Sequence, residues 1–196
     1  MNDDPRTTRD RILEAALTAF AERGVEATSL DAVAVAIGIR KQTILYWFPS
    51  KDQLLQGVVD HATAELGHRL GRAATLAEPN VVAQIVAVVD ATLRIATTDP
   101  ALLALVRETS RLGPPASSYL ADALAPLVHG AAEALGEGDE PVDRDRARTV
   151  LLGAGARVVG MATEAEIRAD LGLTPDLAWL RARRRALVHD LTAQLT

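Results

Sequence analysis

Residues 28–48 read TSLDAVAVAIGIRKQTILYWF, two short helical patterns separated by a glycine. The first pattern places apolar side chains at the i, i+3, i+4, i+7 spacing of one helical face: Leu30, Val33, Ala34 and Ile37. Gly38 breaks this pattern, because glycine adopts the left-handed backbone found at helix ends at the least cost. A second helix is expected over residues 40–48 and must end before Pro49. Two short helices joined in this way predict a helix-turn-helix.

The second helix of this motif predicts a polar and aromatic outer surface. With Ile44 facing the core, the outward side carries Lys41, Gln42, Thr43, Leu45, Tyr46 and part of Trp47. Cationic, amide, hydroxyl and aromatic groups on a short protruding helix suit the major groove of DNA. The alternative is that the aromatic run 46–48 belongs to the core of an ordinary helical bundle. A nine-residue helix cannot bury three consecutive aromatic residues on one face, which favours DNA binding.

The rest of the chain also predicts helices. Alanine and leucine dominate, and no stretch shows the sustained period-two alternation of a strand. A helix over 8–23 is expected to end at Gly24. The first helix of the motif is expected to start with Thr28 as its cap, because Asp31 follows three residues later. A capping box at Ser50 opens a long helix to about residue 74. Further helices are expected over 81–97, 100–111, 116–135, 143–171 and 175–195.

These elements predict an all-α protein with two domains. Residues 1–50 would form a three-helix helix-turn-helix DNA-binding domain, and residues 51–196 a larger helical domain for ligand binding and dimerisation. Hydrophobic residues make up 48% of the chain, which is enough apolar material for a packed core.

Residues 28–34 and 38–51 together resemble the signature of the TetR family of transcriptional regulators, and the resemblance is specific over residues 8–55. It implies a repressor that a small effector releases from DNA, with the helix that begins at Lys51 carrying the signal. It implies phosphate contacts for Thr28 and Lys51. It also implies contacts to bases or backbone for Arg40, Lys41, Gln42, Thr43, Tyr46 and Trp47. Leu45 departs from the family, which usually has tyrosine there; leucine can touch a thymine methyl group but cannot hydrogen-bond a phosphate.

The charge pattern limits how this DNA contact can be made. The net charge is −5, and residues 1–55 contain seven basic and eight acidic side chains. This balance argues against a generally sticky nucleic-acid binder. The two lysines of the chain, Lys41 and Lys51, both lie in this segment. Recognition must therefore depend on a few placed cations and on helix ends.

Several protein classes are disfavoured by what the sequence lacks. It has no glycine-rich phosphate loop, nucleophile elbow, HExxH motif or nucleotide fingerprint, so neither an enzyme nor a cofactor is expected. It has no cysteine, its first residues show no signal-peptide pattern, and its longest uncharged run, residues 79–89, is too short to cross a bilayer. We therefore expect a cytoplasmic protein that does not engage a membrane.

The helix over 81–97 is apolar nearly all round, which predicts a central position in the larger domain. Its polar residues Asp90 and Arg94 share one face and could point into an effector cavity; the alternative is an i, i+4 ion pair at the surface. The candidate effector contacts are His61, Asp90, Arg94, Glu108 and His129. For the histidines, solvated or internally satisfied side chains are the alternative. Scattered histidines without cysteine make a weak metal site, so no metal is expected.

Any effector cavity would be lined mainly by aliphatic side chains, because Tyr119 and Trp179 are the only aromatic residues beyond the motif. This composition favours a small, mainly apolar effector of lipid or acyl type. An alternative function is a helical lipid-binding or scaffold protein that never contacts DNA. A mobility shift with the DNA upstream of the gene separates the two.

The last two predicted helices are expected to form a homodimer, so that two reading helices meet a palindromic operator on double-stranded DNA. The predicted interface joins a stripe containing small residues to a leucine seam and gives a four-helix bundle. Its residues are Val150, Gly153, Ala154, Arg157, Val158, Met161, Leu180, Leu187 and Leu191. The alternative is that both helices only complete the core of one protomer.

Overall fold

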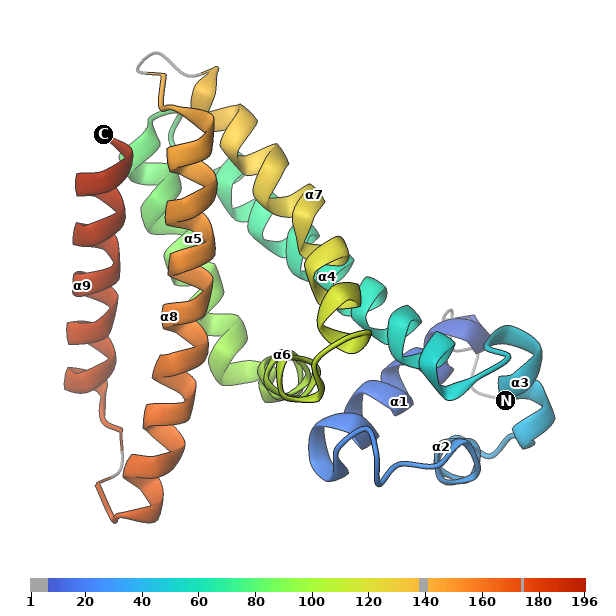
Figure 1. Ribbon diagram of the computed structural model, residues 1–196. Coiled ribbons are helices and arrows are strands. Elements are labelled where there is room, and N and C mark those ends of the chain that lie inside the picture. The colour runs from blue at the N-terminus through green and yellow to red at the C-terminus, as the bar shows by residue number, and fades with distance from the viewer. Residues whose placement is uncertain (1–6, 138–140, 174) are drawn as a thin grey trace. The chain divides into compact units, whose positions relative to one another are not determined.

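The computed structural model describes residues 7–137, 141–173 and 175–196 (Figure 1). Within these residues it contains nine α-helices and no strand, which confirms the predicted all-α class. The helices are α1 (Thr8–Arg23), α2 (Leu30–Ala36), α3 (Lys41–Trp47), α4 (Lys51–Leu76), α5 (Val81–Thr98), α6 (Pro100–Leu112), α7 (Ala116–Gly136), α8 (Arg144–Asp170) and α9 (Leu177–Leu195). The last begins two residues later than predicted, because the Asp176 carboxylate caps it by accepting a hydrogen bond from Trp179 N at 2.7 Å.

The chain divides into two compact units. The first comprises Met1–Ala64 and Ala101–Ala123, and the second comprises Glu65–Pro100 and Leu124–Thr196. The unit that holds the helix-turn-helix is therefore larger than the segment 1–50. The first half of α4 belongs to it and contributes the buried residues Leu54 and Val58, and nearly all of α6 belongs to it as well. The functional boundary at residue 50 stays a prediction.

Helix α1 starts and ends where the sequence predicts. Thr7 Oγ1 accepts a hydrogen bond from Asp10 N at 3.1 Å, and the Asp10 carboxylate accepts one from Thr7 N at 3.2 Å. Gly24 ends the helix at φ +82°, a backbone conformation that favours glycine. The Arg11 guanidinium donates to the carbonyl of Ile37 at 3.1 Å, which ties α1 to the end of α2.

The helix-turn-helix consists of α2 and α3 around Gly38. Gly38 has φ +70°, and Ile39 N donates to the carbonyl of Ala34 at 3.0 Å, so the turn satisfies the carbonyl end of α2. Val33 of α2 and Ile44 of α3 are fully buried and hold both helices on the core. The predicted break at glycine and the predicted inward face of α3 are both present.

The start of α2 differs from the prediction, because Ser29 rather than Thr28 caps this helix. Ser29 Oγ accepts a hydrogen bond from Ala32 N at 3.1 Å. The Thr28 hydroxyl instead lies within hydrogen-bonding distance of the carbonyl oxygens of Ala19, at 3.1 Å, and Gly24, at 2.8 Å. The expected cap at Thr28 is therefore wrong, and its side chain joins the end of α1 to the start of α2.

The core of the first unit is formed by α1 to α4 together with α6. Its largest fully buried apolar side chains are Phe20, Ile12, Leu13, Ile44, Leu54, Leu105, Val33, Val58 and Val59. Gly57 of α4 allows the Phe48 ring to approach this helix closely, because an added methyl group would lie 2.7 Å from the ring. The Arg9 guanidinium covers the same ring, with its carbon 5.4 Å from the ring centre.

In the second unit α5, α8 and α9 pack together, and ion pairs cross between them. The Arg184 guanidinium of α9 donates to the Asp90 carboxylate of α5, with one distance of 2.9 Å. Arg157 of α8 donates to Asp190 of α9 at 2.7 Å. Asp90 thus pairs across helices with Arg184 rather than along its own helix with Arg94.

By length and composition alone, α5 is apolar enough to cross a membrane. It nevertheless carries Asp90 at its middle, where the carboxylate is paired with Arg184. Ile85, Val89 and Ile95 are buried against the rest of the unit. A core helix of a bundle meets the same length and composition criteria, and α5 does contact α8 and α9. Three of its 18 residues are buried within one chain, so it is less covered than the predicted central position requires.

Candidate nucleic-acid interface

The outer surface of α3 is formed by side chains opposite the buried Ile44. Gln42 and Tyr46 lie on that side, and Tyr46 is 80% exposed while Trp47 is 43% exposed. The Tyr46 and Trp47 rings meet edge to face, with centres 5.4 Å apart. Of the three consecutive aromatic residues, only Phe48 is buried. Exposed apolar rings beside an amide on a short helix form a surface suited to a DNA groove.

The ammonium group of Lys41 is held by the chain itself. Its Nζ lies 2.7 Å from the Asp31 carboxylate, and both side chains are substantially exposed. Arg40 caps α3 through its backbone and has an exposed side chain. Thr43 is half-buried, and Leu45 lies at the edge of the exposed surface. These four residues lie in α3 or directly before it. Their side chains differ in exposure and in binding partners, and therefore in how freely they can reach DNA.

Lys51 stands at the first turn of α4. Its Nζ donates to the backbone carbonyl of Glu26 at 3.0 Å, and the Ser50 hydroxyl accepts from Gln53 N at 3.1 Å. The first turn of a 26-residue helix attracts anions, because its backbone N–H groups and the helix dipole point outward. A phosphate contact at this position is thus electrostatically favourable.

Thr28 does not share this surface. It is only 2% exposed, and its hydroxyl is turned toward the carbonyl oxygens of Ala19 and Gly24. A side chain in this position shapes the turn that precedes α2. We therefore assign Thr28 a positioning part and do not place its hydroxyl on a phosphate.

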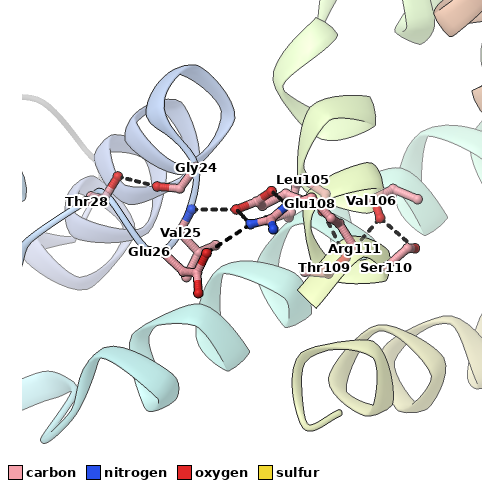
Figure 2. A network of polar contacts seen from close by, with 10 residues as sticks. All are labelled: Gly24, Val25, Glu26, Thr28, Leu105, Val106, Glu108, Thr109, Ser110 and Arg111. Atoms are coloured by element: carbon pink, nitrogen blue, oxygen red, sulfur yellow. Dashed lines mark hydrogen bonds and ion pairs between the residues drawn. The ribbon is translucent and has the colours of Figure 1, made fainter. Parts of the chain in front are cut away.

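A polar network that the sequence does not predict connects α6 with the turn between α1 and α2 (Figure 2). Glu108 Oε1 accepts a hydrogen bond from Val25 N at 2.9 Å. The Arg111 guanidinium donates to the two Glu108 oxygens at 2.8 and 3.1 Å and to the Glu26 carboxylate at 3.3 Å. The i, i+3 spacing could have indicated the Glu108–Arg111 pair, but no local pattern indicates the contact with Val25.

The Glu108 carboxylate is charged at neutral pH. The hydrogen bond from Arg111 lowers its pKa below the ordinary value of 4.5, partial burial opposes this, and the hydrogen bond from Val25 N lowers it further. Because the pKa in the folded state is lowered, the contact stabilises the fold above the ordinary pKa. This stabilisation is lost only as the pH falls through the lowered value.

The five candidate effector residues are divided between the two units. His61 and Glu108 belong to the first unit, whereas Asp90, Arg94 and His129 belong to the second. Glu108 binds the Val25 backbone, Asp90 is paired with Arg184, and Arg94 and His129 are exposed. His61 is a half-buried residue of α4.

The predicted dimer residues are divided between the interior of the protomer and its surface. Four of them are buried within one chain: Val150, Val158, Leu187 and Leu191. Arg157 is held by Asp190, and Ala154, Met161 and Leu180 are half-buried. Within one chain these buried residues form the inward faces of α8 and α9, as in the alternative that both helices complete the core of one protomer, and their part in a dimer stays a prediction. Gly153 is exposed, and an added methyl group there would meet no atom within 4 Å.

The opposite face of α8 is exposed and mainly apolar. Its members are Thr149, Leu152, Gly153, Ala156, Gly160 and Ile167, which we call the outer stripe. Leu152 is 55% exposed and Ile167 is 54% exposed. Large apolar side chains flanking small ones on one helical face are typical of a helix–helix contact.

No group of three or more His, Asp or Glu side chains is arranged to hold a metal ion among residues 7–137, 141–173 and 175–196.

Comparison with known proteins links the first unit to one family. Residues 12–58 match the family model described as bacterial regulatory proteins, tetR family. The chain is 36% identical over 55 residues to the HTH-type transcriptional repressor KstR2 of Mycolicibacterium smegmatis, which is 28% of this chain and 27% of that protein. The chain thus matches about a quarter of the length of this curated relative.

Solved structures extend the likeness to the whole fold. The transcriptional regulator FadR from Bacillus subtilis, crystallised in complex with stearoyl-CoA, has a TM-score of 0.75 at 16% identity, covering 94% of this chain and 98% of that one. A TetR transcriptional regulator from Legionella pneumophila has a TM-score of 0.73 at 21% identity, covering 97% and 99%. These likenesses confirm the fold predicted from the sequence: an amino-terminal helix-turn-helix followed by a larger helical region.

Proposed function

We propose that this chain, a member of the TetR family, is a transcriptional repressor that binds a palindromic operator as a dimer and leaves it when a small, mainly apolar effector binds. The observation that carries the proposal is α3. Its buried Ile44 fixes the helix on the core, so that Gln42, Tyr46 and part of Trp47 face outward. The match of residues 12–58 to bacterial regulatory proteins supports the same use of this surface.

Selection of bound fragments from a random DNA pool tests the proposal most directly. We expect a two-fold symmetric site whose half-sites lie about one DNA turn (roughly 34–36 Å) or slightly more apart. Recovery of a motif without symmetry would argue against a dimeric reader. Absence of any enriched sequence, together with no mobility shift on the DNA upstream of the gene, would favour a helical binding protein that does not contact DNA.

The division of work between Lys51 and α3 gives a first expected result. Lys51→Ala should weaken binding by a similar factor on every DNA sequence and flatten the dependence of log K on log salt by about 0.9, as for one lost phosphate contact. Gln42→Ala should instead alter base preference by about 1–3 kcal/mol at one position. Binding assays at four salt concentrations, on operator and on point-substituted operators, distinguish the two. A change of base preference in Lys51→Ala alone would contradict this orientation of α3.

The Asp31–Lys41 pair gives a second expected result. Asp31→Asn removes the carboxylate that holds Lys41, so the freed ammonium should add a phosphate contact. We expect tighter binding to random DNA and a salt dependence steeper by about 0.9. Glu22→Gln on α1 changes the net charge equally and serves as the control; Glu22 is exposed. Equal slopes for both variants would show that Lys41 already contacts DNA with Asp31 in place.

The dimer contact is proposed at the outer stripe of α8. On α9, Ala178, Ala182, Arg185 and His189 form an exposed face of their own. Two such helix pairs from two copies would make a four-helix bundle. The proposed contact uses the two helices predicted from the sequence and includes the predicted Gly153. It differs in being made by the exposed faces of α8 and α9 instead of by their buried residues.

The effector is proposed to bind in the second unit. The apolar residues of α5 other than Ile85, Val89 and Ile95 remain half-buried or exposed in one chain, so apolar surface is available along this helix. The fold likeness to a FadR crystallised with stearoyl-CoA agrees with an acyl-type ligand. Titration of the operator complex with stearoyl-CoA, with free CoA as the control, tests this choice. DNA release by both compounds would contradict an apolar effector.

A further inference from the structure

The turn between α1 and α2 is held from two sides. From α6, the Glu108 carboxylate accepts the Val25 N–H, and Arg111 reaches the Glu26 carboxylate (Figure 2). From the first turn of α4, Lys51 Nζ donates to the Glu26 carbonyl at 3.0 Å. Glu26 is therefore bound at its side chain by α6 and at its backbone by the lysine that we propose to contact DNA.

We infer that Glu108 and Arg111 are positioning residues for DNA binding, acting through the α1–α2 turn on Lys51. The inference rests on the proposed function. It makes α6 a second connection to the DNA-contacting end of the protein, beside α4, which starts with Lys51 itself.

Glu108 is the stronger member of this network. Its side chain is only 14% exposed, and it accepts the Val25 N–H, which would lose its partner if Glu108 were truncated. Hydrogen bonds to a charged, partly buried acceptor are stronger than neutral ones. The Arg111–Glu26 pair is exposed on both sides and contributes little by itself. Arg111 therefore acts mainly by orienting Glu108.

Gly24 explains why the carboxylate can approach the turn so closely. A methyl group added at Gly24 would lie 3.0 Å from Glu108 Oε1, and its φ of +82° is unfavourable for other residues. The glycine that ends α1 thus also leaves room for the contact with α6. From the sequence, only its part in ending α1 can be predicted.

Through its chain connections, α6 joins the Glu108 network to the unit in which we propose that the effector binds. Residue 99 joins α6 to α5, and residues 113–115 join it to α7. All of α5 belongs to the second unit, where we propose that the effector binds. An effector that favours another arrangement of α5 would turn or shift α6, and Glu108 would transmit that change to the α1–α2 turn.

A double-mutant cycle tests the inference. Glu108→Gln keeps an oxygen that can accept the Val25 N–H but loses the charge that holds Arg111. We expect it to weaken operator binding about three- to tenfold and to flatten the salt dependence toward that of Lys51→Ala. In the Lys51→Ala background the same substitution should change binding less than about 1.5-fold, because the group on which it acts is gone. Arg111→Gln, which leaves the Glu108–Val25 contact in place, should show the same dependence on Lys51.

Controls separate this inference from a loss of fold and from the proposed function. Glu133→Gln makes the same chemical change on an exposed site of α7 and should leave binding and salt dependence unaltered. If Glu108→Gln weakens operator binding by the same factor with Lys51 present and with Lys51→Ala, the inference is overturned. This holds whether or not the variants are less stable to heat. If the unaltered protein bound no DNA at all, the proposed function itself would fail.

Discussion

Gly153→Arg is expected to split the dimer and to weaken operator binding about 1,000-fold or more. An added methyl group at Gly153 meets no atom of its own chain within 4 Å, so the protomer has room for the larger side chain. In a dimer formed through the outer stripe, the same side chain would press a charge between closely packed helices. A monomer reads one half-site, and its affinity should fall toward that for random DNA, typically 10³-fold or more below the specific value.

Sedimentation and mobility shifts on the same preparation check this result. Gly71→Arg on α4 is the matched control, because it is also an exposed helical glycine with open space around it. It should remain a dimer and bind the operator. A Gly153→Arg protein that still sediments as a dimer would place the contact elsewhere than on the outer stripe.

Phe20→Ala is expected to destabilise the first unit by about 3–5 kcal/mol. Phe20 is the largest of its fully buried side chains, and removal leaves a cavity in the core on which α3 rests. Operator binding should be lost with the fold. Phe20→Leu restores most of the volume and should cost much less. Val35→Ala, at an exposed position on α2, should change stability by less than about 0.5 kcal/mol.

Trp47 fluorescence in a Trp179→Phe background reports unfolding of the first unit alone, because Trp179 lies in the second. Denaturant titration of the three variants then gives the free energy of unfolding for that unit. A loss below about 1 kcal/mol for Phe20→Ala would show that this side chain is not central to the core.

Features set by neighbouring residues were predictable from the sequence. Gly38 ends α2 as its backbone freedom requires, and Ser50 caps α4. The outward face of α3 follows once Ile44 is assigned to the core. Even here the expected cap at Thr28 is wrong, because the adjacent Ser29 carries the same kind of hydroxyl and caps α2 instead. Only the carbonyl groups at the end of α1, which attract the Thr28 hydroxyl, decide between them.

Features that depend on which surfaces meet were not predictable. Helical spacing predicts the apolar seam containing Leu187 and Leu191, but it does not tell whether a neighbouring helix of the same chain or a second chain covers it. Both residues are buried within the protomer. The contact of Glu108 with Val25 joins residues 83 positions apart, and a single sequence carries no signal for such a pair.

The engagement of Lys41 by a carboxylate of its own chain affects how the protein would find its site. The Lys41 ammonium is held by Asp31 and is not fully available to a passing phosphate, whereas Lys51 gives one hydrogen bond to the neutral Glu26 carbonyl and keeps its charge and further donors for DNA. Sliding along random DNA depends on just such sequence-independent attraction. With that attraction reduced, each visit to random DNA would be short, and the search through the genome would proceed mainly by release and recapture. Only at a site where α3 fits the groove would Lys41 gain by exchanging Asp31 for a phosphate.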